Sequence, residues 1–87
     1  MTKEFIQLRN EINKIDNQLM ILIKKRLKIV DRIKKFKIDK NLPFEDRRRE
    51  EEIIRTKAEK SGLPKKFVSS IYKIIFSESK KDSKFRE

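Results

Sequence analysis

Cysteine and histidine are both absent from this chain of 87 residues. Their absence excludes disulfides, zinc sites of the usual ligand sets and nucleophilic catalysis by a cysteine or a histidine. Long hydrophobic runs are also missing: the longest, Leu19 to Ile23, is far too short to span a bilayer, and the basic N-terminus lacks the apolar core of a signal peptide. We therefore expect a soluble, cytoplasmic protein.

Glycine occurs once, at Gly62, and proline twice, at Pro43 and Pro64. So few turn-forming residues predict an all-α protein rather than a β-sandwich or an α/β fold. The length suits one small domain, residues 1–87, whose single core is only marginally stabilising.

Charged residues make up 45% of the chain, and the net charge is +11. This excess of positive charge has two interpretations: attraction to an anion, either nucleic acid or a small polyanion, or lysine-rich helix faces that only interact with water. Net charge bears on solubility and association and not on fold, so it does not decide between them.

Apolar residues at helical spacing predict three helices. We expect them from about Lys3 to about Ile38, from about Glu45 to about Lys60 and from about Lys65 to about Lys81. Residues 39–43 and 61–64 form the breaks, with Gly62 as a left-handed cap and Pro64 at the start of the third helix. Residues 82–87 are expected to form a frayed tail.

The first helix is too long for a monomeric globule. A helix of about 35 residues is about 52 Å long, whereas a compact chain of this size has a radius of gyration of about 12 Å. Its overhanging apolar seam is formed by Leu8, Ile12, Ile15, Leu19 and Leu22. We expect an intertwined homodimeric bundle, because in a twofold dimer the seam of one chain packs against the seam of the other.

Arg26 occupies a position of this seam, and Ile29 and Ile33 continue the stripe beyond it. Burying an unpaired charge is costly, so the guanidinium indicates an anionic partner. A buried ion pair or a side chain that reaches back to solvent is an equally open alternative. Lys37, four residues after Ile33, is a second cation on the same stripe, and the two cations together suggest a cavity for something negative.

Polar residues also lie on the apolar faces of the other helices. Asp46 and Glu50 precede Ile53 on one side of the second helix, and Ser79 continues the stripe of Ile75 on the third. Taken singly, Glu50 or Ser79 is more simply explained as the point where an apolar face reaches solvent. Two cations, two carboxylates and a hydroxyl on facing helices are, however, how ligand sites in helical bundles are made.

These residues resemble the all-helical chorismate mutases of the AroQ class, over about residues 5 to 83. The resemblance rests on Leu8-Arg9, Ile12, Ile15-Asp16, Leu19, Leu22, Arg26, Lys37, Pro43, Asp46, Arg49-Glu50 and Ser79. It implies an intertwined dimer of three-helix chains that converts the dicarboxylate chorismate to prephenate, a step toward phenylalanine and tyrosine.

The resemblance also implies roles for the charged side chains. Arg26 would hold one substrate carboxylate, and the partner subunit's Arg9 would bind the other. Lys37 would donate to the ether oxygen of the breaking bond. Glu50, with the backbone near Asp46, would hold the substrate hydroxyl.

Two further residues complete the implied site: Ser79 would assist at the ring carboxylate, and Arg49 resembles an additional active-site arginine. The reaction is a unimolecular Claisen-type rearrangement, which needs no nucleophile, general base, metal or cofactor. It needs a compact substrate conformer and positive charge at the ether oxygen. A chain without histidine or cysteine can provide both.

One position departs from the family pattern. The family usually has Gln, sometimes Glu, four residues after the serine, where it makes a second contact to the ether oxygen. Here that position is Ser83, which is too short, so that water or Lys84 substitutes or the contact is missing. This departure predicts a slow mutase.

Three other interpretations remain open. An isochorismate-pyruvate lyase of the same fold would clamp a similar dicarboxylate. A basic nucleic-acid-binding module is suggested by the charge and by residues 34–37, although such a module would leave its seam apolar, unlike Arg26. The third is a degenerate mutase fold that docks on another enzyme of the aromatic pathway as a regulatory or assembly partner.

Overall fold

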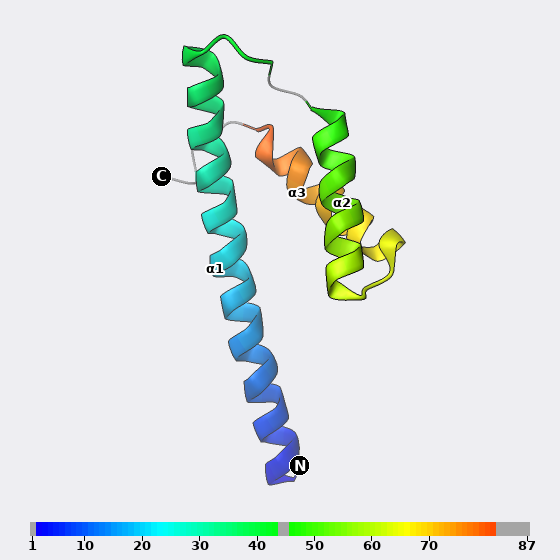
Figure 1. Cartoon of the computed structure of the whole chain (residues 1–87). Helices are drawn as coiled ribbons and strands as arrows, with labels where there is room; N and C mark the ends of the chain where they lie inside the picture. The colour runs from blue at the N-terminus through cyan, green and yellow to red at the C-terminus, as the bar shows by residue number, and fades with distance from the viewer. Residues whose placement is uncertain (1, 44–45, 82–87) are drawn as a thin grey trace.

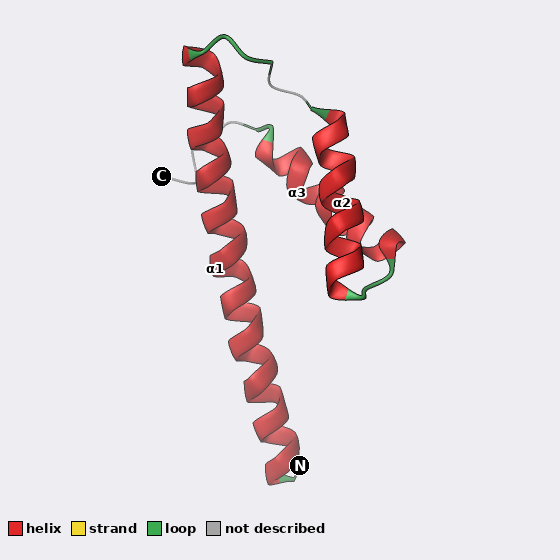
Figure 2. Cartoon of the chain, in the orientation of Figure 1, coloured by secondary structure: helices red, strands yellow, loops and turns green. Residues whose placement is uncertain are grey.

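The computed structural model describes residues 2–43 and 46–81, which form three helices (Figures 1 and 2). They are α1 (Lys3–Asp39), α2 (Arg47–Ser61) and α3 (Lys65–Ser79), and the described residues contain no strand. The predicted all-α class is confirmed. α2 begins two residues later than expected and α3 ends two residues earlier, while the expected tail at 82–87 lies outside the described residues.

Both ends of α1 are capped by side chains and backbone that the sequence supplies locally. Thr2 Oγ1 accepts a hydrogen bond from the Phe5 amide at 3.2 Å, as an N-cap does. At the other end, Asn41 adopts a left-handed φ of 54°, its amide donates to Ile38 O, and the Leu42 amide donates to Lys37 O at 2.8 Å. This pair of bonds is a Schellman motif, which fixes the last turn of α1.

The start of α2 is set by Asp46, whose Oδ1 accepts from the Arg49 amide at 3.0 Å. Because Asp46 is the N-cap, it lies just outside the helix that was expected to include it. At the other end Gly62 has a φ of 71°, which confirms the predicted left-handed cap, and Pro64 directly precedes α3.

α3 is the helix that connects the other two, because it packs on α2 along its length and contacts α1 near its own C-terminal end (Figure 1). The shared core is small. Among residues 2–43 and 46–81 the buried apolar side chains are Leu27, Ala58 and Val68, one from each helix.

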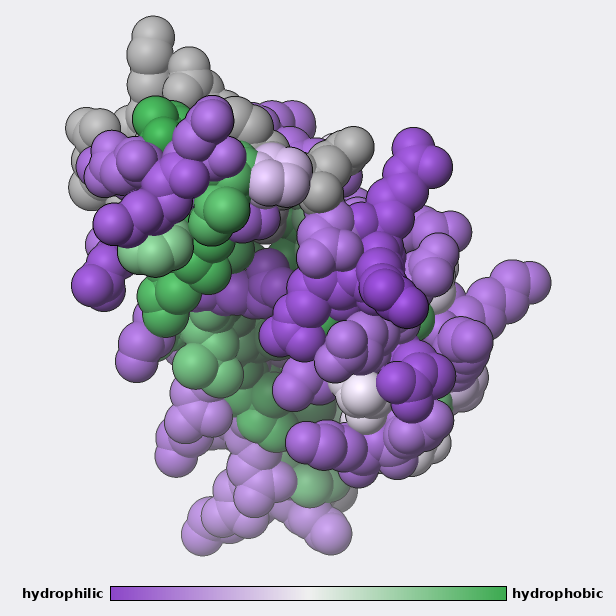
Figure 3. Space-filling view, turned by 45° about the horizontal axis from the view of Figure 1, so that its top comes forward, coloured by the Kyte–Doolittle hydropathy of each residue, from purple (hydrophilic) through white to green (hydrophobic). Residues whose placement is uncertain are grey.

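The N-terminal half of α1 extends away from α2 and α3 (Figure 1). The molecule measures 58 × 31 × 16 Å with a radius of gyration of 16.6 Å, well above the value of about 12 Å for a compact globule of this length. The predicted overhang is therefore confirmed. Its seam residues, from Leu8 to Leu22, are each between 49% and 61% exposed, and Figure 3 shows apolar side chains gathered in a band along α1.

No helix of the described part of the chain has both the length and the apolar character needed to cross a membrane.

Candidate active site

A cleft of about 840 Å³ lies where the C-terminal half of α1, the start of α2 and the end of α3 meet; we refer to it as the main cleft. Its charged lining consists of Arg26, Lys34, Lys37, Asp46, Arg49, Glu50, Lys80 and Lys81. Apolar side chains such as Val30, Ile33 and Phe76 complete its walls. The volume and this mixed lining suit a small organic anion.

The main cleft brings together six of the eight residues that the sequence singles out. They are Arg26, Lys37, Asp46, Arg49, Glu50 and Ser79. Arg9 lies on the overhanging part of α1, where its guanidinium carbon is 4.6 Å from the centre of the Phe5 ring. Ser83 lies outside the described residues, so its contact stays a prediction.

Arg26 is half-buried, and its nearest described partners are aromatic rings of α3. Its guanidinium carbon lies 5.7 Å from the ring centre of Tyr72 and 5.6 Å from that of Phe76. None of the ion pairs between described residues includes Arg26. The buried-ion-pair alternative is therefore wrong within this part of the chain, and aromatic faces stabilise the cation instead.

Lys37 lies in the last turn of α1 and lines the main cleft. Its carbonyl oxygen accepts the Leu42 amide in the Schellman motif, so the backbone that carries this ammonium group is fixed at the helix end. A lysine on a fixed backbone can present a compact positive charge to a single oxygen atom of a ligand.

The two carboxylates of the main cleft both have partners. Glu50 Oε2 lies 3.6 Å from Lys80 Nζ, which joins α2 to the residue after α3. Asp46 caps α2 through the Arg49 amide. The Arg49 side chain in turn lies 3.3 Å from Glu52, three residues further along α2.

Ser79 is only 6% exposed, so the simple expectation that it marks the solvent end of an apolar face is wrong. Its Oγ donates to the Ile75 carbonyl oxygen at 2.7 Å, one turn earlier in α3. In this rotamer the hydroxyl can accept a hydrogen bond from a ligand. Donating to a ligand carboxylate requires the hydroxyl to leave Ile75.

Sequence reasoning missed three cations of the main cleft, Lys34, Lys80 and Lys81. Lys34 Nζ donates to the Lys81 carbonyl oxygen at 3.1 Å and lies 3.6 Å from Asp31, so it ties the chain after α3 to α1. A signal was available, because Lys34 is one turn after Val30 on the stripe of Arg26. It was interpreted instead as part of a basic surface run.

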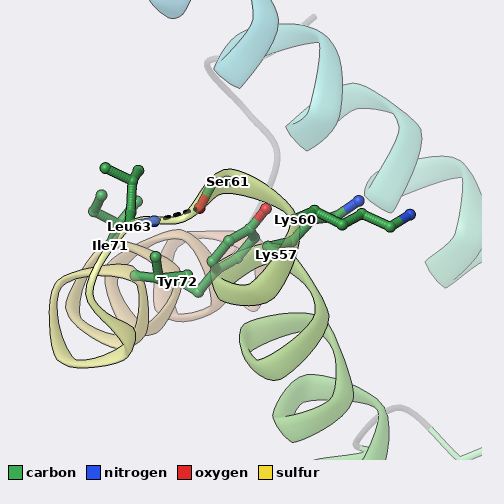
Figure 4. A pocket seen from close by; sticks show the side chains of 7 residues that line it. Lys57, Lys60, Ser61, Leu63, Ile71 and Tyr72 are labelled. Carbon is green, nitrogen blue, oxygen red and sulfur yellow. Dashed lines mark hydrogen bonds between the residues drawn. The ribbon is translucent and has the colours of Figure 1, made fainter.

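A second, smaller cleft of about 410 Å³ lies at the turn between α2 and α3 (Figure 4). It is lined mainly by apolar side chains such as Leu63, Val68 and Ile71, and the Leu63 amide donates to Ser61 Oγ at 3.1 Å at its edge. None of the residues predicted for the site lines it. No group of described residues has the composition of a metal site.

The fold and the main cleft define a three-helix protein with a cationic, mixed-polarity ligand site between its helices. The family model for chorismate mutase type II matches residues 8–84, nearly the whole chain. The chain belongs to the chorismate mutase type II family, which confirms the resemblance inferred from the sequence.

One curated relative is the bifunctional chorismate mutase/prephenate dehydratase of Buchnera aphidicola subsp. Schizaphis graminum (strain Sg), 32% identical over 79 residues. The match covers 87% of this chain and 20% of that protein, so the chain spans about a fifth of the length of the relative it matches. No solved structure matches the chain.

Proposed function

We propose that this chain is a chorismate mutase that converts chorismate to prephenate in the main cleft. The observation that carries the proposal is that Arg26 and Lys37 from α1 face Glu50 from α2 around one volume. Family membership and the name of the Buchnera relative support the same reaction. The substrate is a dicarboxylate, which suits a lining with more cations than carboxylates.

The rearrangement requires a substrate held in its reactive conformer and positive charge near its ether oxygen. Arg26 binds one carboxylate through two N–H groups, which holds the flexible substrate in its compact reactive conformer. Lys37 presents its ammonium group to the ether oxygen as that oxygen gains negative charge in the transition state. Glu50 accepts a hydrogen bond from the substrate hydroxyl through the oxygen that does not face Lys80.

A second copy of the chain completes the site in this proposal. The seam of α1 is half exposed and only three apolar side chains are buried among the described residues, so the single chain leaves most of its apolar surface in water. A twofold partner covers the seam and brings the partner subunit's Arg9 to the open side of the main cleft. Arg9 then binds the second carboxylate. The cytoplasmic location expected from the sequence stays a prediction.

The proposal is tested by incubating the purified chain with chorismate and following its consumption and its product. We expect prephenate, with turnover reduced about a hundredfold or more in Arg26→Ala and in Lys37→Ala. Lys35→Ala is the matched control, since Lys35 is exposed on the same helix and does not line the main cleft. Activity that survives both substitutions would contradict this site. Pyruvate release from isochorismate, without prephenate from chorismate, would instead identify a lyase.

A further inference from the structure

The Arg26 side chain lies against two aromatic rings of α3. Tyr72 and Phe76 lie one turn apart on the same face of α3, with ring centres 5.5 Å apart and ring planes tilted by 39°. The Arg26 guanidinium carbon lies within 6 Å of both ring centres, at 5.7 and 5.6 Å. We call these two rings the aromatic seat.

We propose that the aromatic seat positions Arg26 for its anionic ligand, so that Tyr72 and Phe76 are positioning residues of the mutase reaction. This inference rests on the proposed function and deepens it. Neither ring was singled out as part of the site by the sequence pattern.

The physical argument concerns what the rings leave available. A carboxylate partner would hold Arg26 by occupying its N–H groups and neutralising its charge, which are the two properties needed to bind a substrate carboxylate. An aromatic face attracts the cation electrostatically, but it neither neutralises the charge nor forms the paired N–H···O bonds of a carboxylate. The rings therefore restrict the guanidinium before the substrate arrives and leave its charge and its donors for the substrate.

The neighbouring carboxylates are consistent with this role. Glu50 is paired with Lys80, and Asp46 accepts the Arg49 amide at the start of α2. Both anionic groups that line the main cleft are thus engaged away from Arg26. The guanidinium has no competing counterion among the described residues.

The decisive experiment replaces Phe76 by phenylalanines with one, two and three ring fluorines. Fluorination withdraws electron density from the ring face and changes the ring size little, so it weakens cation–π attraction in steps. We expect kcat/KM for chorismate to fall with each fluorine, by about tenfold for the trifluoro residue, while the melting temperature stays constant. The same series at Phe67, an exposed phenylalanine of α3 that does not line the main cleft, is the control.

Tyr72 gives an independent second arm. Tyr72→Phe keeps the ring and removes the hydroxyl, and we expect activity close to that of the wild type. Tyr72→Leu removes the ring and is expected to lower kcat/KM about tenfold. The inference would be overturned if kcat/KM of the active enzyme did not change along the Phe76 series. It would also be overturned if Tyr72→Phe and Tyr72→Leu changed kcat/KM equally.

A measurement without substrate separates this inference from the proposed function. Proton resonances of the Arg26 side chain, assigned by their loss in Arg26→Lys, should be shifted upfield by the ring currents and should move back in Phe76→Leu. Arg26 proton chemical shifts equal to those of a solvent-exposed arginine in the wild type would overturn the aromatic seat, whether or not the protein is active. A wild type that does not consume chorismate while these shifts are present refutes the proposed function alone.

Discussion

Lys80 Nζ lies 3.6 Å from Glu50 Oε2 and so links the residue after α3 to the first turn of α2. The two side chains are 50% and 26% exposed, and ion pairs that are this accessible to solvent contribute at most about 1 kcal/mol to stability. The contact therefore matters for where the Glu50 carboxylate lies and little for whether the chain folds.

We expect Lys80→Met to lower kcat/KM for chorismate about three- to tenfold with little change in melting temperature, because Glu50 loses the group that orients it. The measurement is a double-mutant cycle with Glu50→Gln. If Lys80 acts through Glu50, the second substitution adds almost nothing to the first. Full additivity of the two losses would show that Lys80 acts separately, and Lys73→Met on the exposed side of α3 is the matched control.

The shared site can be tested by mixing two inactive variants, Arg9→Ala and Arg26→Ala. In a heterodimer of these chains, one site has both substitutions and the other has neither, provided that Arg9 crosses to the partner. After denaturation and joint refolding of an equal mixture, half the dimers are mixed, so we expect about a quarter of the wild-type activity to return. No recovery in mixtures that do form heterodimers would place Arg9 in the site of its own chain.

The seam of α1 makes a separate prediction about assembly. Ile12 is half exposed in the single chain, so Ile12→Lys should be harmless to a monomer but should bury a charge in a twofold seam. We expect this variant to sediment as a monomer and to lose activity, although residue 12 is far along α1 from the main cleft. The control is Asn13→Lys, one position off the seam. Equal sedimentation of the two variants at the wild-type mass would contradict the intertwined dimer.

Gly62 gives a prediction on stability. Its φ of 71° is unfavourable for any residue with a Cβ, although a Cβ built there meets no atom within 4 Å. Gly62→Ala should therefore cost about 1 kcal/mol through backbone strain and not through a clash. In a domain of this size the melting temperature should fall by about 4–8 °C in calorimetry. Lys57→Ala on the exposed side of α2 should leave it nearly unchanged, and an unchanged value for Gly62→Ala would refute the strain argument.

Ser83 lies outside the described residues, and its prediction comes from the sequence. By resemblance to the family, Ser83→Gln supplies a second donor to the ether oxygen and should raise turnover, by up to about a hundredfold. The readout is kcat at saturating chorismate, with Ser83→Ala as the control that removes the hydroxyl and adds no reach. A gain in both variants, or in neither, would show that the position does not act as this donor.

The helices were predictable because their determinants are local. The apolar spacing of residues 3–39, the break before Pro64 and the left-handed Gly62 each act within a few residues of chain. The bounds that were missed depend on single hydrogen bonds, such as the one from the Arg49 amide to Asp46.

The site was predictable only in part, because many of its contacts join side chains from different helices. The stripe position of Arg26 and Lys37 can be inferred from one helix alone. That Arg26 rests on Tyr72 and Phe76, and that Lys80 faces Glu50, depends on how α3 crosses the other two helices. Spacing along the chain carries no such information. The expected role of Arg9 in the site of a partner subunit concerns a second chain, and it stays a prediction.

The small core described above also gives the ligand a structural role. The buried side chains Leu27, Ala58 and Val68 form a small core, and α3 contacts α1 less extensively than it contacts α2. In the proposed function, a dicarboxylate bound between Arg26 and Glu50 would bridge α1 and α2. A ligand that binds only the folded chain raises the free energy of unfolding by an amount that grows with the ratio of its concentration to its Kd. In such a protein the bound ligand takes the place of part of the missing core. The melting temperature should therefore rise with the ligand concentration.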